Sequence, residues 1–166
     1  GITNRPVSGA VNAIAPHPSN STILYAGAVN GGIWRTNNAT TNPPTWTRQT
    51  DAATSQSITS LSFDPTDANR QTLVAGIGNN SSFAGIGNVL TGMLRTTDGG
   101  TTWVQASGTP PGVPRLDGKD VRAVAARGAT LLAGTRVGLF RSTDSGASYV
   151  QRTPANGGFA LGSVSD

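Results

Sequence analysis

The feature that most constrains this sequence is that it repeats itself. Three segments can be aligned along the 166 residues, and they begin at Val11, Ile58 and Val121. Each contains an alternating stretch, a stretch with an Ala-Gly pair, then Gly, two apolar residues and Arg, and finally a stretch opened by an aromatic residue. Such a chain folds as copies of one supersecondary unit, and each copy buries its apolar face against its neighbours.

The period of the repeat predicts the kind of unit. A period of about 45 residues with four short strands is typical of β-propeller blades, and one large insertion interrupts it here. We predict an all-β fold, a partial β-propeller with about three four-stranded antiparallel blades and the start of a fourth. The predicted parts are an N-terminal segment 1–10, blades at 11–51, 58–107 and 121–153, and the start of a fourth blade at 154–166. Residues 120–127 contain good helix formers, but their alignment with two alternating copies favours a strand.

Three blades do not close a ring, because closed propellers have roughly four to eight. The two outer blade faces would stay exposed as apolar patches. We therefore expect the partners of this chain to include the remaining blades of a larger propeller, or further chains that close the ring. A fragment of a larger propeller is the favoured interpretation, and two copies that close a ring of about six blades are the alternative.

The composition excludes several kinds of chemistry. The chain has no cysteine and no glutamate, which excludes disulfides, thiolate metal sites and any mechanism that needs a glutamate from this chain. No metal and no cofactor is expected. The net charge is only +4 and the arginines are scattered, so we expect a weak diffuse potential and no nucleic-acid partner. No stretch reaches the roughly 18 apolar residues of a membrane-spanning helix.

The turn before the last strand of the second and third repeats carries the most specific motif. An aspartate carboxylate there can accept N–H bonds from the residues that follow, and a glycine can adopt a positive φ without steric cost. The first copy departs from the motif, with Asn37 and Asn38 at the place of the aspartate and a longer turn. We interpret the six matching residues as structural: Asp98, Gly100, Trp103, Asp144, Gly146 and Tyr149.

This motif resembles the Asp-box, S/T-x-D-x-G-x-T-W, or BNR repeat, of the sialidase, sortilin and xyloglucanase-type propellers. The first repeat, with APHPSN, ILYAG and NGGIWRT, also resembles secreted or cell-surface bacterial propellers, and it is similar to the photosystem II stability and assembly factor. The resemblance covers essentially the whole chain. It implies an extracytoplasmic propeller in which the Asp-boxes lie on the face opposite the active site.

Function is expected on the face that carries the long loops. The second repeat has two insertions, 79–91 and 108–120, and both belong to the face formed by the loops after the second and fourth strands of a blade. We predict one ligand- or partner-binding surface there, with Phe83 as an apolar or sugar-stacking platform. Its candidate residues are Asn30, Asn79, Asn80, Phe83, Arg115, Asp117, Lys119 and Arg136. Solvated loops without a partner are the alternative interpretation.

No catalytic residue is predicted. A glycoside hydrolase places two carboxylates roughly 5–9 Å apart, and Asp51, Asp117 and Asp120 near this face suggest no pair. Where xyloglucanase-like enzymes have a catalytic aspartate in the first such loop, this chain has Val29. The sequence favours a non-catalytic extracytoplasmic module that binds a protein or a glycan, or that scaffolds a larger assembly. The alternative is a fragment of a secreted glycoside hydrolase whose catalytic carboxylates lie in blades not present here.

Overall fold

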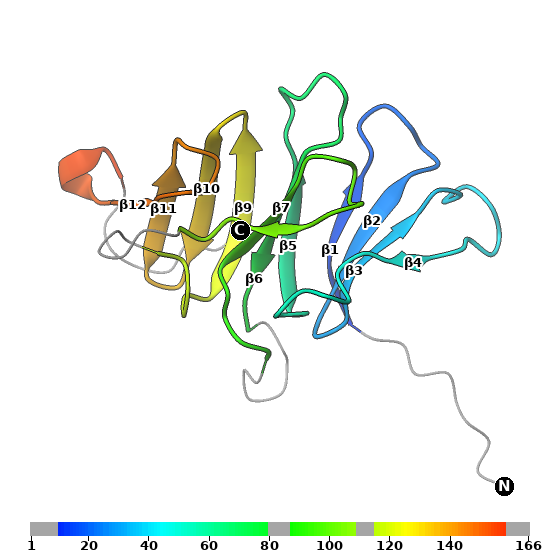
Figure 1. The fold of residues 1–166 in the computed structure, drawn as a ribbon, viewed down its shortest axis with the longest axis horizontal. Helices are drawn as coiled ribbons and strands as arrows, with labels where there is room; N and C mark the ends of the chain where they lie inside the picture. The colour runs from blue at the N-terminus through cyan, green and yellow to red at the C-terminus, as the bar shows by residue number, and fades with distance from the viewer. Residues whose placement is uncertain (1–9, 80–86, 109–114, 159–166) are drawn as a thin grey trace, which may run out of the picture.

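The computed structural model describes residues 10–79, 87–108 and 115–158. These residues form three four-stranded antiparallel sheets, one from each sequence repeat (Figure 1). The predicted all-β fold is therefore confirmed. The start of the predicted fourth blade contributes only the 3-10 turn η1 (Pro154–Asn156), since residues 159–166 lie outside the described part of the chain. No described helix is long and apolar enough to cross a membrane.

Within each sheet the strands follow one another in chain order. The first sheet contains β1 (Val11–Pro16), β2 (Leu24–Ala28), β3 (Gly32–Thr36) and β4 (Thr47–Arg48). The second contains β5 (Ile58–Phe63), β6 (Leu73–Ile77), β7 (Met93–Thr96) and β8 (Val104–Gln105). The third contains β9 (Val121–Arg127), β10 (Thr130–Thr135), β11 (Gly138–Ser142) and β12 (Val150–Arg152). The aromatic residue predicted to open the last strand stands directly before it in every sheet.

The three sheets share one register, so positions can be compared between them. The alanine of the Ala-Gly pair faces Trp34 in the first sheet, Leu94 in the second and Phe140 in the third. A register shift also occurs at the same place between the first two strands of every sheet. Because side chains alternate between the two faces of a strand, equivalent residues point to equivalent sides of each sheet.

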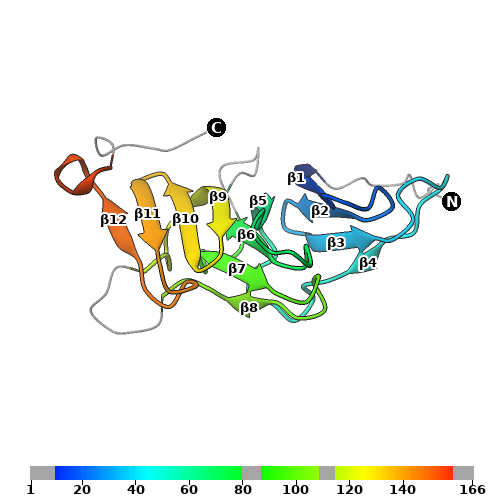
Figure 2. The ribbon, with the colours of Figure 1, turned by 90° about the horizontal axis from the view of Figure 1, so that it is seen from above.

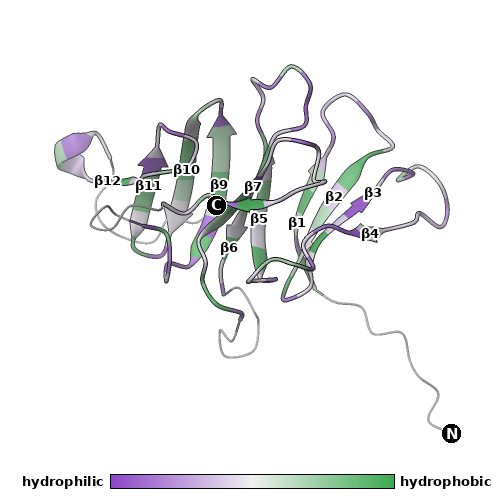
Figure 3. Ribbon diagram, in the orientation of Figure 1, coloured by the Kyte–Doolittle hydropathy of each residue, from purple (hydrophilic) through white to green (hydrophobic). Residues whose placement is uncertain are grey.

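The sheets pack side by side in chain order (Figure 2). An apolar cluster lies at each of the two interfaces between them. The middle sheet contributes to both clusters, because Leu73 and Ala75 belong to the interface with the first sheet and Val74 to the interface with the third. Every residue of β6 is buried. The hydropathy colouring shows apolar strands running through this stack (Figure 3).

Glycine in the second strand of a sheet allows the next sheet to approach closely. A Cβ atom on Gly27 would lie 2.4 Å from Cγ2 of Ile58, and one on Gly76 would lie 3.0 Å from Cγ1 of Val121. In both cases the neighbour is the first residue of the following sheet. The repeated Ala-Gly pair is thus explained by packing between sheets.

Two buried tyrosines connect neighbouring sheets by hydrogen bonds. The hydroxyl of Tyr25 donates to the carbonyl of Gly99 at 2.7 Å, and the hydroxyl of Tyr149 donates to the carbonyl of Ala106 at 2.6 Å. Burial raises the pKa of both hydroxyls, so both stay protonated donors at neutral pH. Each bond runs between consecutive sheets.

Loops gather on two opposite faces of the stack. On one, which we call the turn face, backbone amides of the turns after the third strands bond to the loops after the first strands; these amide–carbonyl pairs are Ala39–Thr22, Gly99–Gln71 and Ser145–Ala129. On the other, the loop face, residues after the second strands bond to the segments that connect one sheet to another. Gly32–Gln56 and Gly118–Leu90 join a sheet to the segment that leads into the next one, whereas Arg136–Asp120 joins the third sheet to the segment that leads into it.

Candidate functional site

The loop face is hollowed between the second and third sheets. The hollow, which we call the loop-face pocket, has a volume of about 470 Å³. Its walls come from the residue pair after β6, the residues before β7, the segment before β9 and the β10–β11 turn. It is lined by Asn79, Leu90, Gly118, Lys119, Asp120, Arg136 and Val137. Three of the predicted binding residues, Asn79, Lys119 and Arg136, therefore meet at one place.

Asp120 connects the walls of this pocket. It is only 8% exposed. One carboxylate oxygen accepts a hydrogen bond from the backbone amide of Asn79 at 2.9 Å, and the other accepts one from the guanidinium of Arg122 at 3.1 Å. Its backbone carbonyl accepts the amide of Arg136 at 3.2 Å. Both carboxylate oxygens are thus already used, and the side chain positions two neighbouring segments.

The remaining charges in the pocket are positive. Lys119 places its ammonium 5.4 Å from the centre of the Phe140 ring, and Arg136 is exposed on the β10–β11 turn. Within the described part of the chain, neither cation forms an ion pair with a carboxylate. The pocket therefore offers two cationic donors to a ligand and no free carboxylate.

Other predicted binding residues lie apart from the pocket. Arg115 and Asp117 form an ion pair with each other, and Asp117 also accepts a hydrogen bond from the side-chain amide of Gln105 at 3.2 Å. Their charges are therefore largely neutralised. Asn80 and Phe83 lie outside the described residues.

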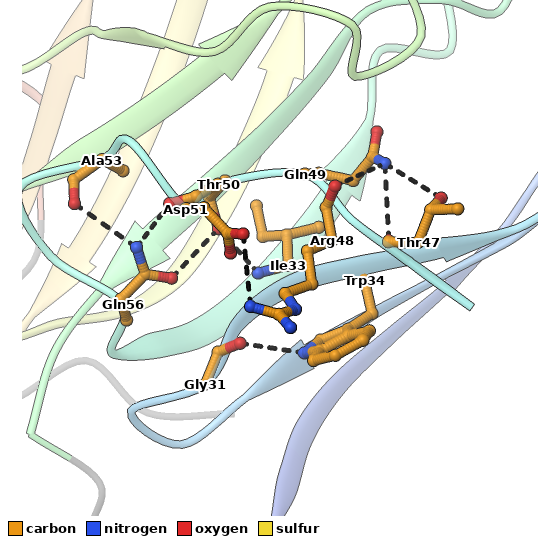
Figure 4. Close-up of polar contacts among 10 residues, drawn as sticks. All are labelled: Gly31, Ile33, Trp34, Thr47, Arg48, Gln49, Thr50, Asp51, Ala53 and Gln56. Carbon is orange, nitrogen blue, oxygen red and sulfur yellow. Dashed lines mark hydrogen bonds and ion pairs between the residues drawn. The ribbon is translucent and has the colours of Figure 1, made fainter.

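Asn30 lies in a second hollow, at the first sheet, with a volume of about 640 Å³. Trp34 forms its wall and donates a hydrogen bond from its ring N–H to the carbonyl of Gly31 at 2.9 Å (Figure 4). The guanidinium of Arg48 lies 5.6 Å from the centre of the Trp34 ring and 3.4 Å from a carboxylate oxygen of Asp51. This hollow combines an aromatic ring with a polar rim.

The turns at residues 96–103 and 142–149, which we call the acidic turns, lie on the turn face. One carboxylate oxygen of Asp98 accepts hydrogen bonds from the hydroxyl of Thr96 at 2.8 Å and the amide of Thr102 at 2.9 Å. Its other oxygen accepts the hydroxyl of Thr102 at 2.6 Å. Asp144 bonds in the same way to Ser148. These bonds lower the pKa of both aspartates to about 2, and the largest contributions come from the hydroxyls of Thr102 and Ser148.

The turn of the first sheet reaches the same geometry with an asparagine. The side-chain oxygen of Asn38 accepts hydrogen bonds from the hydroxyl of Thr36 at 2.8 Å and from the amide of Thr45 at 2.9 Å. The motif is not recognisable in the sequence of this copy, because three extra residues separate Asn38 from its partner Thr45. The hydroxyl of Thr45 donates to the same oxygen at 3.1 Å, so one amide oxygen takes the place of the two carboxylate oxygens of the acidic turns.

Substituting Asp98 tests how the acidic turns contribute to stability. We expect Asp98→Ala to lower the free energy of unfolding by about 1 kcal/mol at pH 7, because the Thr102 amide loses its acceptor. Asp98→Asn should retain most of the stability, as Asn38 does in the first sheet. The pKa of Asp98 is about 2 in the folded protein, below the value of about 3.9 in the unfolded chain. The carboxylate therefore stabilises the fold fully above about pH 3.9, and this stabilisation is lost as the pH falls through about 2. Urea unfolding at pH 7 and pH 2 measures both effects, and equal losses for Ala and Asn would contradict the expectation.

A metal site is not evident in the part of the chain that the structure describes, since no three His or acidic side chains are grouped there. The pocket is also lined by Asp120, Gly118 and Val137, which were not among the predicted binding residues. The two long loops that contain Asn79 and Asp120 were predicted to form one surface, but no pattern in the sequence indicates the hydrogen bond between these two residues.

Comparison with solved structures decides the architecture. No protein-family model and no curated protein matches the chain. The crystal structure of a GH74 xyloglucanase from Xanthomonas campestris matches 86% of the chain with 27% identity and a TM-score of 0.57. The structure of YCF48 from Cyanidioschyzon merolae matches 92% with 16% identity and a TM-score of 0.58, and YCF48 bound to a D1 peptide matches 93% with 21% identity and a TM-score of 0.59. The structure is a partial β-propeller.

The three sheets are accordingly three blades of that propeller. This chain spans 20% of the length of the xyloglucanase and 40% and 44% of the lengths of the two YCF48 chains. Each of these proteins is thus much longer than the three blades seen here.

Proposed function

We propose that this chain is a non-catalytic propeller module that binds a protein ligand, through an acidic segment of that ligand, at the loop-face pocket. The observation that carries the proposal is the charge arrangement in the pocket. Lys119 and Arg136 are available as donors, whereas the carboxylate of Asp120 is occupied by its two hydrogen bonds. An anionic group would gain charge-assisted hydrogen bonds there and would meet no free negative charge.

Two further observations support a peptide ligand. The volume of about 470 Å³ falls within the range of known ligand sites and fits a few side chains of a peptide. One of the similar structures, YCF48, contains a bound D1 peptide. Asn79 at the pocket wall adds a side-chain amide that can bond to a peptide backbone.

A glycan is the second candidate ligand. The observation that favours it is the hollow at Trp34, where an aromatic ring stands beside Asn30 and Asp51. An aromatic face with a polar rim suits the apolar face and hydroxyls of a sugar ring. The identity of 27% with a xyloglucanase points in the same direction.

Hydrolysis is not proposed for this chain, because the described residues of the loop face offer no pair of free carboxylates. Asp51, Asp117 and Asp120 each form an ion pair with an arginine. A glycoside hydrolase needs one carboxyl group as acid and a second as base or nucleophile. A hydrolase whose carboxylates lie in other blades stays the alternative for a longer protein.

The acidic turns are, in this proposal, Asp-boxes that hold the turn face, while binding occurs on the opposite face. The support is the matching hydrogen-bond pattern of Asp98 and Asp144. An extracytoplasmic location belongs to the same proposal. It rests on the resemblance of the first repeat to secreted propellers.

Calorimetric titration with a synthetic peptide tests the pocket. The probe is an octapeptide rich in glutamate, and its control is the same peptide with glutamine in place of glutamate. We expect only the acidic peptide to bind, with an affinity that falls as salt is added. Lys119→Ala and Arg136→Ala should each weaken binding about fivefold, which corresponds to about 1 kcal/mol.

Arg127→Ala is the matched control for Arg136→Ala. Arg127 is also an exposed arginine of the third blade, but it ends β9 on the turn face. Its removal changes the net charge by the same amount and should leave the affinity unchanged. Equal weakening by both variants would mean that diffuse charge attracts the peptide, and it would refute the pocket as the binding site.

A further inference from the structure

Two apolar side chains line the loop-face pocket beside its cations, and neither takes part in the proposed contact with an anionic group. Leu90 lies on the wall from the second blade, in the segment before β7, and is half-buried. Val137 lies on the wall from the third blade, in the β10–β11 turn, and is 54% exposed. The pocket therefore has an apolar residue on each of these two walls.

The β10–β11 turn holds Val137 in a defined position. Its backbone amide donates to the hydroxyl of Thr135 at 3.2 Å, and that hydroxyl donates to the carbonyl of Gly138 at 2.7 Å. The carbonyl of Val137 accepts the side-chain amide of Gln151 at 2.7 Å. Thr135 is completely buried, so these bonds anchor the turn to the blade. An apolar side chain on such an ordered turn loses little conformational entropy when a ligand covers it.

Each apolar residue stands next to a cation. The carbonyl of Leu90 accepts the amide of Gly118 at 2.8 Å, and Gly118 directly precedes Lys119. On the other wall, Val137 directly follows Arg136. A ligand that places an anionic group between the two cations therefore brings its neighbouring atoms against the two apolar side chains.

We propose that the peptide segment bound at the loop-face pocket carries a large apolar side chain beside its acidic side chain. The inference rests on the proposed function and narrows the class of its ligand. The acidic group would bond to Lys119 and Arg136. The apolar side chain would enter between Leu90 and Val137, and burial of these surfaces would add a favourable contribution that involves no charge.

The apolar walls would make the site selective among acidic segments. Two cations attract every acidic segment, and the gain is small where water and salt screen the charges. Covering Leu90 and Val137 depends instead on the size of the ligand side chain next to the acid. At equal peptide charge, the site should therefore prefer leucine to serine at that position.

Calorimetric titration with two octapeptides of equal charge tests the inference. Both are rich in glutamate, and they differ only at one central residue, which is leucine in the first and serine in the second. We expect the leucine peptide to bind about fivefold more tightly, because its side chain loses part of its contact with water. Added salt should weaken the binding of both peptides, whereas the ratio of their affinities should persist.

Val137→Ser should lower that ratio from about fivefold to about twofold or less, because one apolar wall is lost. Val150→Ser is the matched control. Val150 is a valine of the same blade with a similar exposure of 51%, but it lies on β12 and does not line the pocket. Its replacement should leave the ratio unchanged. Both side chains are more than half exposed, so both variants should fold, which circular dichroism checks.

The outcomes separate this inference from the proposed function. Equal affinity for the two peptides, with binding that still depends on Lys119 and Arg136, would overturn the inference and leave the proposed function intact. A preference for leucine that Val137→Ser does not reduce, or that Val150→Ser reduces equally, would also overturn it. If neither peptide binds, the proposed function is refuted, and the inference with it.

Discussion

Replacing Tyr149 with alanine is expected to lower the free energy of unfolding by about 4 kcal/mol. The side chain is completely buried between the second and third blades, where it belongs to the same apolar cluster as Met93. Its removal would leave a cavity at this interface and would deprive the carbonyl of Ala106 of its hydrogen bond. Urea unfolding at neutral pH measures the loss. Tyr149→Phe, which removes only the hydroxyl, should cost about 1 kcal/mol.

The same position in the other two blades provides the control. Trp103 packs against the cluster between the first and second blades, and Trp103→Ala should cost about 2–3 kcal/mol. No described blade precedes Trp46, which is 37% exposed, and Trp46→Ala should cost about 1 kcal/mol or less. A loss for Trp46→Ala as large as that for Tyr149→Ala would contradict the arrangement of the blades.

The second large effect is expected for Gly146→Ala, at about 3 kcal/mol. Gly146 has a φ of 93°, which an alanine adopts only with strain. A Cβ atom there would also lie 2.7 Å from Cβ of Ala106 in the second blade. The acidic turn of the third blade would have to move away from its neighbour. Thermal and urea unfolding both report the change.

Gly118→Ala separates backbone strain from crowding. Gly118 has a φ of 72°, but no described atom lies within 4 Å of the position of its Cβ. This variant should cost only about 1 kcal/mol, the strain of a left-handed alanine. If Gly146→Ala and Gly118→Ala cost the same, the close approach between the acidic turn and the second blade does not exist in solution.

The repeats made most of the fold predictable. Helix propensity favoured a helix at residues 120–127, yet the alignment correctly predicted strand β9, because the equivalent segments alternate as strands do. The Ala-Gly pair could be located in the sequence but not explained. Its reason lies in contacts between blades, such as that of Gly27 with Ile58, which a single repeat does not contain.

The candidate site was predictable only in part. Loop length singled out the segments of Asn79 and Lys119, and blade topology predicted that Arg136, in a short loop, shares their face; all three line the loop-face pocket. The role of Asp120 depends on its hydrogen bond with the amide of Asn79 in the other long loop, and no pattern in the sequence indicates that bond. The exposure of Trp46 could not be predicted from its own repeat either, because Tyr149 at the same position of the third repeat is buried. Burial here is decided by the neighbouring blade.

The packing of the middle blade between two others positions the walls of the loop-face pocket. Native-state hydrogen exchange tests this packing most directly. In a stack of repeats the outer units open more readily than those covered on both sides. Every residue of β6 is buried, and we expect its amides to exchange more slowly than those of β2 and β10. Exchange in β2 or β10 that is as slow as in β6, or slower, would contradict the arrangement of the three blades.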